Sequence, residues 1–230
     1  MLRLATAGAL ALATCLSASA FAQNQNYPTN GYIGVFGDAA GTNCCVGIPP
    51  AAATTLHVIA VTGGETTAGI TGAEFRIEIS PPAPGAFLVW TSAPGANLTI
   101  GNPMDNSSAA IDNSGVNIAF PTCQKQMGMA GDHIAIGTIM VFGLTGEHTM
   151  LVKKHNRPSN PNMKAPLVVL CDSPTYTQVP LTLLEGDPKL VGLEPTSFRT
   201  PINSASCSGA SCGFVAVQQR TWTALKDLYR

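Results

Sequence analysis

Charged side chains are scarce in this chain. Its 230 residues include 12 Lys and Arg and 13 Asp and Glu, together 11% of the sequence, whereas about a quarter is usual for a soluble protein. No basic region exists that could attract nucleic acid or an anionic membrane, so we expect neither as a partner. The abundant Gly, Pro, Ser, Thr and Asn predict a neutral surface, which suits an exported protein that contacts a polymer, a glycan or copies of itself.

Motifs for catalysis and for cofactor binding are missing as well. No His-x-His, His-Glu-x-x-His or Cys-x-x-Cys occurs. Glu74 and Glu78 have Arg76 between them on the same strand face, so we interpret them as a solvated charge ladder and not as the paired acids of a glycosidase. We therefore predict that the chain is not an enzyme and uses no cofactor.

Metal ligands are only weakly indicated. Asp105, Asp112 and Asp132 are calcium candidates because oxygen donors in loops suit that ion. Their spacing fits no EF-hand or nonapeptide repeat, so we expect solvated loops instead. The histidines are expected on the surface or on the second face of a strand; they are His57, His133, His148 and His155.

The first 22 residues have the pattern of a secretory signal peptide. Arg3 is their only charge, an apolar run follows, and residues 20–22, Ala-Phe-Ala, form a cleavage site. The run is too short for a good membrane-spanning helix, so we expect no membrane span. A lipid anchor at Cys15 is the rival interpretation, which Thr14 and the downstream cleavage site disfavour. We predict a secreted protein, extracellular or periplasmic, exported by a bacterial type of pathway.

Six cysteines remain after cleavage, and an even number in an exported chain indicates disulfides. They are Cys44, Cys45, Cys123, Cys171, Cys207 and Cys212. The last two enclose a turn-like spacer, so we pair them with each other. The first two are neighbours and poorly placed to join each other, so each is expected to bridge to one of the middle two, in either combination. This scheme excludes a bridge between Cys123 and Cys171.

The segment Gly72–Ser80 has apolar residues strictly on alternate positions. One face carries Ala73, Phe75, Ile77 and Ile79, and the other carries Glu74, Arg76 and Glu78. A period of two predicts a β-strand with one face on a core and the other in water. We expect the other strands to lie beside or opposite this one.

About nine short strands are predicted in all, with turn signals between them and no convincing helix. They are residues 32–36, 56–62, 72–80, 87–91, 97–100, 115–120, 133–144, 149–154 and 167–171, followed by a candidate last strand at 179–184. The run 133–144 is expected to be a central strand with a bulge or bend at Gly137. The fold class is therefore all-β, an antiparallel β-sandwich of immunoglobulin-like or jelly-roll-like type, over residues 30–184.

Residues 185–230 are predicted to form a C-terminal extension. A connector rich in proline and glycine, residues 185–206, is followed by the small disulfide loop and by a short helix at 221–230. A helix of this length is not stable alone, so its apolar face must dock on the sandwich or on a partner. The candidate partner-docking residues are Trp222, Leu225 and Tyr229.

Three of these segments together carry a resemblance to a known family. Gly72–Ser80, then Gly-Val-Asn-Ile-Ala-Phe at 115–120, then Ile-Ala-Ile-Gly-Thr-Ile-Met-Val-Phe at 134–142, resemble the strands of cohesins and related carbohydrate-binding modules. The resemblance covers about residues 54–170. It implies a β-sandwich that binds a dockerin, binds polysaccharide or serves as scaffolding. No family binding residue can be transferred, since no planar aromatic strip is visible.

Two functions follow as hypotheses. The first is a structural or cell-surface interaction protein that uses its sheet edges or C-terminal helix for assembly with itself or with another surface protein. The second is a cohesin-like or carbohydrate-binding module that recognises a protein or a glycan on one sheet face. A long unprotected edge strand would favour the first hypothesis, and a solvent-facing row of aromatic side chains would favour the second.

Overall fold

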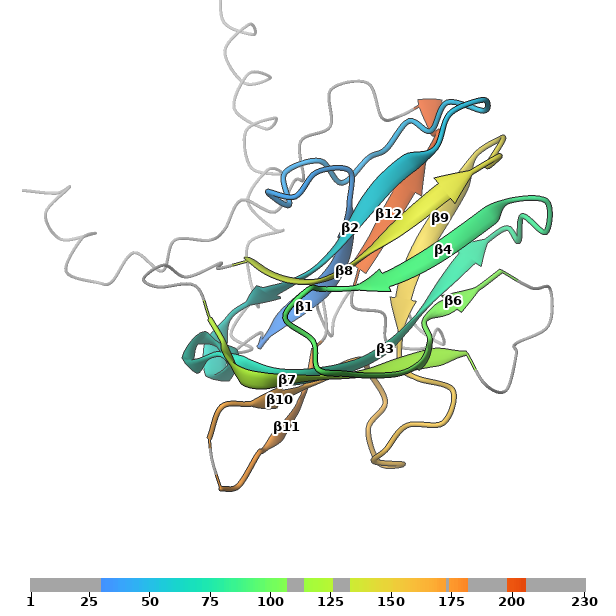
Figure 1. The fold of residues 1–230 in the computed structure, drawn as a ribbon. Helices are drawn as coiled ribbons and strands as arrows, with labels where there is room; N and C mark the ends of the chain where they lie inside the picture. The colour runs from blue at the N-terminus through green and yellow to red at the C-terminus, as the bar shows by residue number, and fades with distance from the viewer. Residues whose placement is uncertain (1–29, 107–113, 126–132, 173, 182–197, 206–230) are drawn as a thin grey trace, which may run out of the picture.

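The computed structural model describes residues 30–106, 114–125, 133–172, 174–181 and 198–205, and these residues are mostly β-strand (Figure 1). The elements are β1 (Gly31–Phe36), β2 (Thr54–Thr62), the 3-10 helix η1 (Gly64–Ala68), β3 (Ile70–Ser80), β4 (Phe87–Ser92), β5 (Leu98–Asn102), β6 (Met104–Asp105), β7 (Gly115–Gln124), β8 (His133–Phe142), β9 (His148–Lys153), β10 (Leu167–Leu170), β11 (Gln178–Pro180) and β12 (Phe198–Ile202). The predicted C-terminal helix and its docking residues, like the signal peptide, lie outside the described residues.

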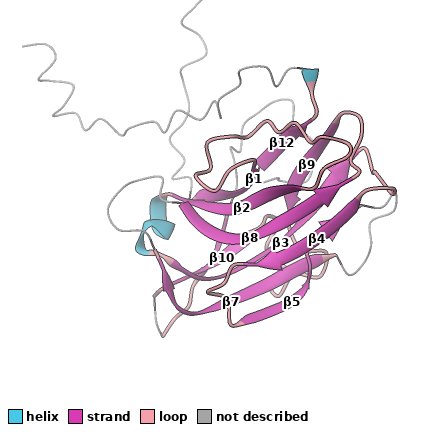
Figure 2. Cartoon of the chain, turned by 45° about the horizontal axis from the view of Figure 1, so that its top comes forward, coloured by secondary structure: helices cyan, strands magenta, loops and turns pink. Residues whose placement is uncertain are grey.

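Two sheets face each other, as Figure 2 shows. The first sheet has the strand order β1-β2-β8-β4. The second has the order β11-β10-β3-β7-β5, with β9 and β6 also paired to β3 and β12 paired to β9. All strand pairs are antiparallel except the short pair β3–β6. The chain is an all-β antiparallel sandwich, which confirms the predicted fold class.

Strand β3 is the centre of the second sheet. Its first half pairs with β10 and β7, and its second half pairs with β9 and β6. Phe75, Ile77 and Ile79 point into the core and are fully buried. Phe75 meets Trp90 of the first sheet edge to face, with ring centroids 6.0 Å apart. The alternating pattern therefore predicted the inward face of β3 correctly.

The other face of β3 is not in water, which corrects the prediction. Glu74 and Arg76 expose only 3% and 4% of their surface. The connection from β9 to β10 contacts this face: Lys154 accepts a hydrogen bond from Arg76 Nε at 3.1 Å, and the Ser159 amide donates to both Glu74 oxygens at 3.0 and 3.1 Å. The solvated ladder is instead a buried charge cluster.

Strand β8 is central in the first sheet, as predicted, and its pairing is irregular at the expected glycine. Val58 of β2 lies opposite Gly137, but Ile59 lies opposite Ala135, so the register shifts by one residue. An ideal Cβ on Gly137 would lie 2.3 Å from the Trp90 ring, so only glycine fits beneath that ring. The missing side chain of Gly137 thus allows Trp90 to pack across β8.

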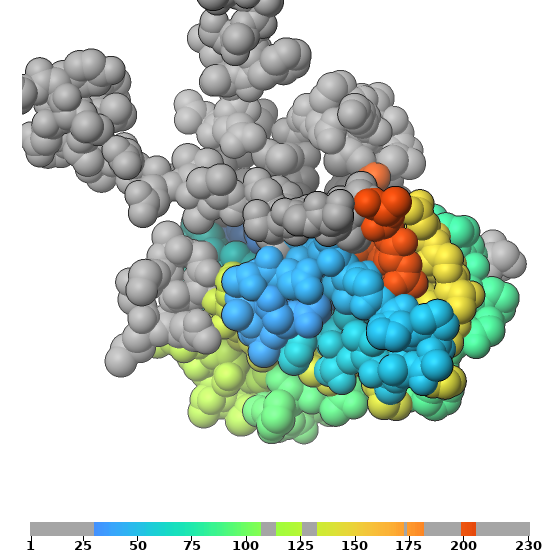
Figure 3. All heavy atoms as spheres, turned by 90° about the horizontal axis from the view of Figure 1, so that it is seen from above, coloured from blue at the N-terminus to red at the C-terminus, as the bar shows by residue number. Residues whose placement is uncertain are grey.

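Strand β12 lies in the segment predicted as a connector. It pairs with β9 over its whole length, Ile202 forms a parallel bridge with Val46, and the Thr200 hydroxyl donates to the Val35 carbonyl at 2.6 Å. Figure 3 shows the orange residues of β12 between the blue β1–β2 region and the yellow residues. The β1 side of the sandwich is therefore closed by β12.

The disulfide pairing also differs from the prediction. Cys123 is bonded to Cys171, the one bridge that the predicted scheme excluded. Strands β7 and β10 flank β3 on opposite edges, and the bridge passes beside Gly69, which precedes β3: an ideal Cβ there would lie 2.6 Å from Cys123 Sγ. Cys44 and Cys45 are disulfide-bonded too, so their partners are not these two cysteines. The predicted Cys207–Cys212 bridge lies outside the described residues.

Candidate functional site on the outer face of the first sheet

The buried charge cluster on β3 is the first place to look for chemistry. Arg76 Nη1 lies 3.0 Å from Glu78 and 3.2 Å from Asp105, and Lys153 Nζ lies 2.8 Å from Glu78. Burial acts to raise the pKa of Glu78, but the contacts with Lys153 and Arg76 outweigh it and leave that pKa lowered. Each of these charges faces an opposite charge, so the cluster holds loops on the sheet and offers no free group to a substrate.

The weak calcium candidates are not brought together. Asp105 is buried against Arg76 and also accepts from the Ser114 hydroxyl at 3.4 Å, so its oxygens face donors and not an open cation site. Asp112 and Asp132 lie outside the described residues. Within the part of the chain that the structure describes, no three His, Cys, Asp or Glu side chains are grouped to hold a metal ion.

Two of the histidines are buried, contrary to the prediction. His148 lies with its two ring nitrogens 2.7 and 2.9 Å from the carbonyl oxygens of Pro81 and Thr145. His155 Nδ1 accepts a hydrogen bond from the Arg157 amide at 2.9 Å. Burial lowers the pKa of His155, and the charge of Glu74 only partly opposes this. Both rings contact the backbone of connecting loops.

An exposed apolar surface lies on the outer face of the first sheet. Phe87 of β4 pairs across the strands with Phe142 of β8, and Val89 pairs with Met140. Phe87, Phe142 and Met140 expose 58%, 46% and 39% of their surface. We call these four residues the β4–β8 face. Large side chains held side by side on a rigid sheet are typical of a binding surface.

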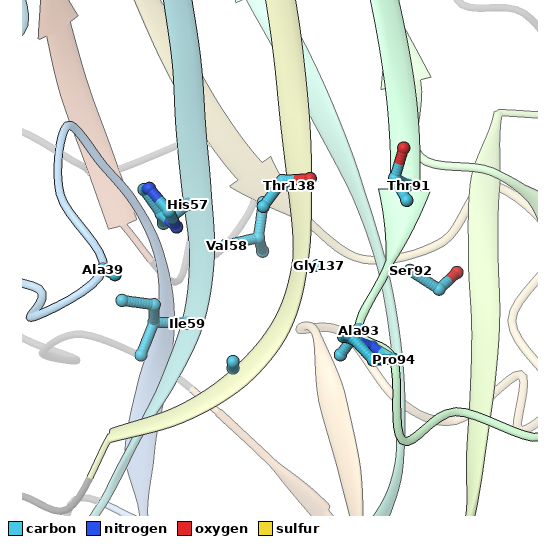
Figure 4. A pocket seen from close by; sticks show the side chains of 11 residues that line it. Ala39, His57, Val58, Ile59, Thr91, Ser92, Ala93, Pro94, Gly137 and Thr138 are labelled. Carbon is cyan, nitrogen blue, oxygen red and sulfur yellow. The ribbon is translucent and has the colours of Figure 1, made fainter.

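A shallow hollow continues this face where the register of β2 and β8 shifts (Figure 4). In Figure 4, His57 of β2 stands on one side of it, Thr91 and Pro94 stand on the other, and Thr138 of β8 lies between them. Its volume is about 210 Å³, smaller than the roughly 300–1,000 Å³ of small-molecule sites. The hollow fits one side chain or one small polar group of a larger partner.

This face was not predicted from the sequence. The run 133–144 was predicted only as a central strand with a bulge or bend at Gly137, without a statement of which side chains point outward. The signal that could have revealed the face is the succession of apolar residues in this run: Ile139 and Val141 point inward, so Met140 and Phe142 must point outward. An outward apolar row on a strand needs either a covering layer or a partner.

Comparisons with known proteins reveal one weak similarity of fold and no similarity of sequence. No protein-family model matches the chain, and no curated protein matches it. Among solved structures it is similar to the sixth cohesin of scaffoldin B from Acetivibrio cellulolyticus, crystallised with a variant of the Cel5 dockerin. The TM-score is 0.40 and the identity is 11%, over 76% of this chain and 99% of the cohesin. This is a weak likeness of fold to a cohesin, without a match at the level of sequence.

Proposed function

We propose that this chain is a non-catalytic β-sandwich protein that binds a protein partner on its β4–β8 face, outside the cytoplasm. The observation that carries the proposal is the exposed row Phe87, Met140 and Phe142 beside a hollow of one side chain's size. An apolar anchor of the partner would fill the hollow, and the row would exclude water around it. The Cys123–Cys171 disulfide fits an oxidising compartment. Among the described residues, no helix is long and apolar enough to cross a membrane.

The binding test compares two aromatic-to-serine variants with similar exposure. The full chain, produced by export so that its disulfides form, is used as bait against surface and secreted proteins of its source. We expect Phe142→Ser to lose the partner that the unchanged chain retains, because half of the aromatic pair is removed. Tyr176→Ser is the control, since Tyr176 is equally exposed in the β10–β11 turn, away from the face. Equal retention of the partner by both variants would refute the proposal.

A second candidate function is glycan binding on the same face. Phe87 and Phe142 could stack on a sugar ring, and the hydroxyls of Thr91 and Thr138 lie nearby on the same side of the sheet. Electrophoresis in gels that contain polysaccharide separates the two functions. Retardation by a polysaccharide that Phe142→Ser abolishes would favour the glycan. Unchanged mobility in every gel, together with capture of a protein, would favour the protein partner.

A further inference from the structure

The second sheet ends in another unpartnered element, the edge strand β5. Among the described residues β5 pairs only with β7, and all five of its residues are exposed. Leu98 and Ile100 expose 52% and 57% of their surface and lie on the outer side of the second sheet, beside Ala119 and Asn117 of β7. One edge of β5 therefore presents unpaired backbone groups next to apolar side chains.

Within the described parts of the chain, no charged side chain lies on this edge. Residues 81–104, which include both β4 and β5, contain no Asp, Glu, Lys, Arg or His, and neither do residues 115–124 of β7. Natural edge strands are usually blunted by charges, prolines or a covering element. Two other edges of this sandwich have such devices: β11 has three residues and ends in Pro180, and β1 lies against β12. The remaining edge, β4, belongs to the β4–β8 face described above.

We propose that two copies of this chain pair antiparallel through β5, so that their second sheets join into one. Identical surfaces meet without like-charge repulsion only when they carry no net charge, and this edge carries none. In the symmetric register Ile100 lies opposite Ile100 of the second copy, and the two Leu98 side chains flank them on the same face. One such pair uses the free edge of both strands, so the assembly closes as a dimer.

Strand pairs of five residues bury little area, so the dimer is expected to be weak and to depend on concentration. The full chain with oxidised cysteines is measured by size exclusion with light scattering and by analytical ultracentrifugation up to about 1 mM. We expect a monomer–dimer equilibrium, with slower amide hydrogen exchange in residues 98–102 as the concentration rises. A chain that stays monomeric over the whole range, or that forms open polymers, would overturn the proposal.

The decisive variant is Ile100→Lys, which places two ammonium groups opposite each other at the centre of the pair. We expect it to weaken the dimer by about tenfold or more. Because Ile100 is exposed, the monomer should keep the thermal midpoint of the unchanged chain, and Leu98→Lys serves as a second variant with the same expectation. The control Phe142→Lys adds the same charge to the β4–β8 face and should leave the dimer intact.

The β5 dimer and the binding site on the β4–β8 face can be refuted independently of each other. If Phe142→Lys dissociates the dimer and Ile100→Lys does not, the copies meet through the β4–β8 face and the β5 proposal is wrong. If Ile100→Lys yields a monomer that still binds the partner lost by Phe142→Ser, the β5 dimer and the β4–β8 site are both supported as separate surfaces. If Phe142→Ser and Ile100→Lys both lose the partner, and Ile100→Lys still forms the dimer, the β5 proposal is wrong.

Discussion

Gly69 lies where the Cys123–Cys171 bridge passes the start of β3. It has φ +102°, and an ideal Cβ there would lie 2.6 Å from Cys123 Sγ and 2.8 Å from the Gln124 carbonyl oxygen. We expect Gly69→Ala to reduce the free energy of unfolding by about 2 kcal/mol or more, because alanine is strained at this φ and its methyl group collides with the bridge.

The matched control is Gly47→Ala, since a Cβ at Gly47 meets nothing within 4 Å. Urea unfolding monitored by circular dichroism measures both variants. Equal stability of the two would show that the bridge does not need the glycine.

His155 makes stability depend on pH. Burial places its pKa below the ordinary value of 6.5, with Glu74 and Arg76 as the charged groups that face it. A histidine with a lowered folded-state pKa contributes stability that is complete above about pH 6.5 and is lost as pH falls through the folded pKa. Protonation at Nδ1 would also break the hydrogen bond from the Arg157 amide.

The variant His155→Asn keeps an acceptor for that amide and cannot titrate. We expect its unfolding free energy to fall less than that of the unchanged chain between about pH 6.5 and pH 5. Urea unfolding series at several pH values measure the difference. Parallel pH curves for the two proteins would contradict this assignment.

Local patterns predicted which β3 side chains point inward but not where the others lie. The alternation placed Phe75 and Ile77 correctly because the period of two follows from the strand itself. The burial of Glu74 and Arg76 depends on Ser159 and Lys154, about 80 positions further along the chain. No local period contains that information.

At the scale of elements, the connection between β9 and β10 is attached to the sheet through Glu74. The Ser159 amide donates to both of its carboxylate oxygens. We expect Glu74→Ala to speed amide hydrogen exchange in residues 155–165 and to lower the free energy of unfolding by about 1–3 kcal/mol, because a buried donor loses its acceptor.

Exchange measured by mass spectrometry on peptides of this connection tests the expectation. Glu65→Ala, at an exposed glutamate of η1, is the control and should leave the exchange unchanged. A Glu74→Ala protein with native protection in residues 155–165 would show that other contacts hold the connection.

Strands with strong alternation were predicted, and strands that depend on tertiary pairing were not. Residues 72–80 and 115–120 alternate and correspond to β3 and β7, and the long apolar run 133–144 corresponds to β8. Strand β12, Phe-Arg-Thr-Pro-Ile, contains Pro201 and has no alternation of apolar and polar residues. Its residues were therefore predicted to belong to a connector. It is a strand because β9 and Val46 supply its partners. The β4–β8 face was missed for a related reason, since an outward apolar row looks like an interior one until the layers are known.

For the molecule as a whole, the remaining bridges are expected to connect the two ends of the chain. Cys123 and Cys171 use each other, whereas Cys44 and Cys45 are bonded elsewhere. Val46 pairs with Ile202, so the loop that carries both cysteines lies beside the chain that leads to Cys207. We expect Cys207 and Cys212 to be their partners, in place of the predicted bridge between those two.

A tryptic digest without reduction distinguishes the schemes. No tryptic cleavage site lies between Arg3 and Arg76, so the peptide that ends at Arg76 contains Cys44 and Cys45. Thr200–Arg220 contains both C-terminal cysteines. These two peptides should elute joined, with the sum of their masses. Recovery of Thr200–Arg220 alone, two mass units below its reduced form, would support the local Cys207–Cys212 bridge instead.

The closure of the sandwich by β12 has a mechanical consequence. In Figure 1 β1 begins well below the point at the top where β12 ends, so with all disulfides reduced a pull between residues 30 and 205 would draw each strand lengthwise along its partner. Loaded in this way, the hydrogen bonds within each ladder, β1–β2 or β12–β9, share the force and must break together, whereas a strand peeled from one end loses its bonds one after another. The reduced chain would therefore resist extension until the weaker of the two ladders gave way.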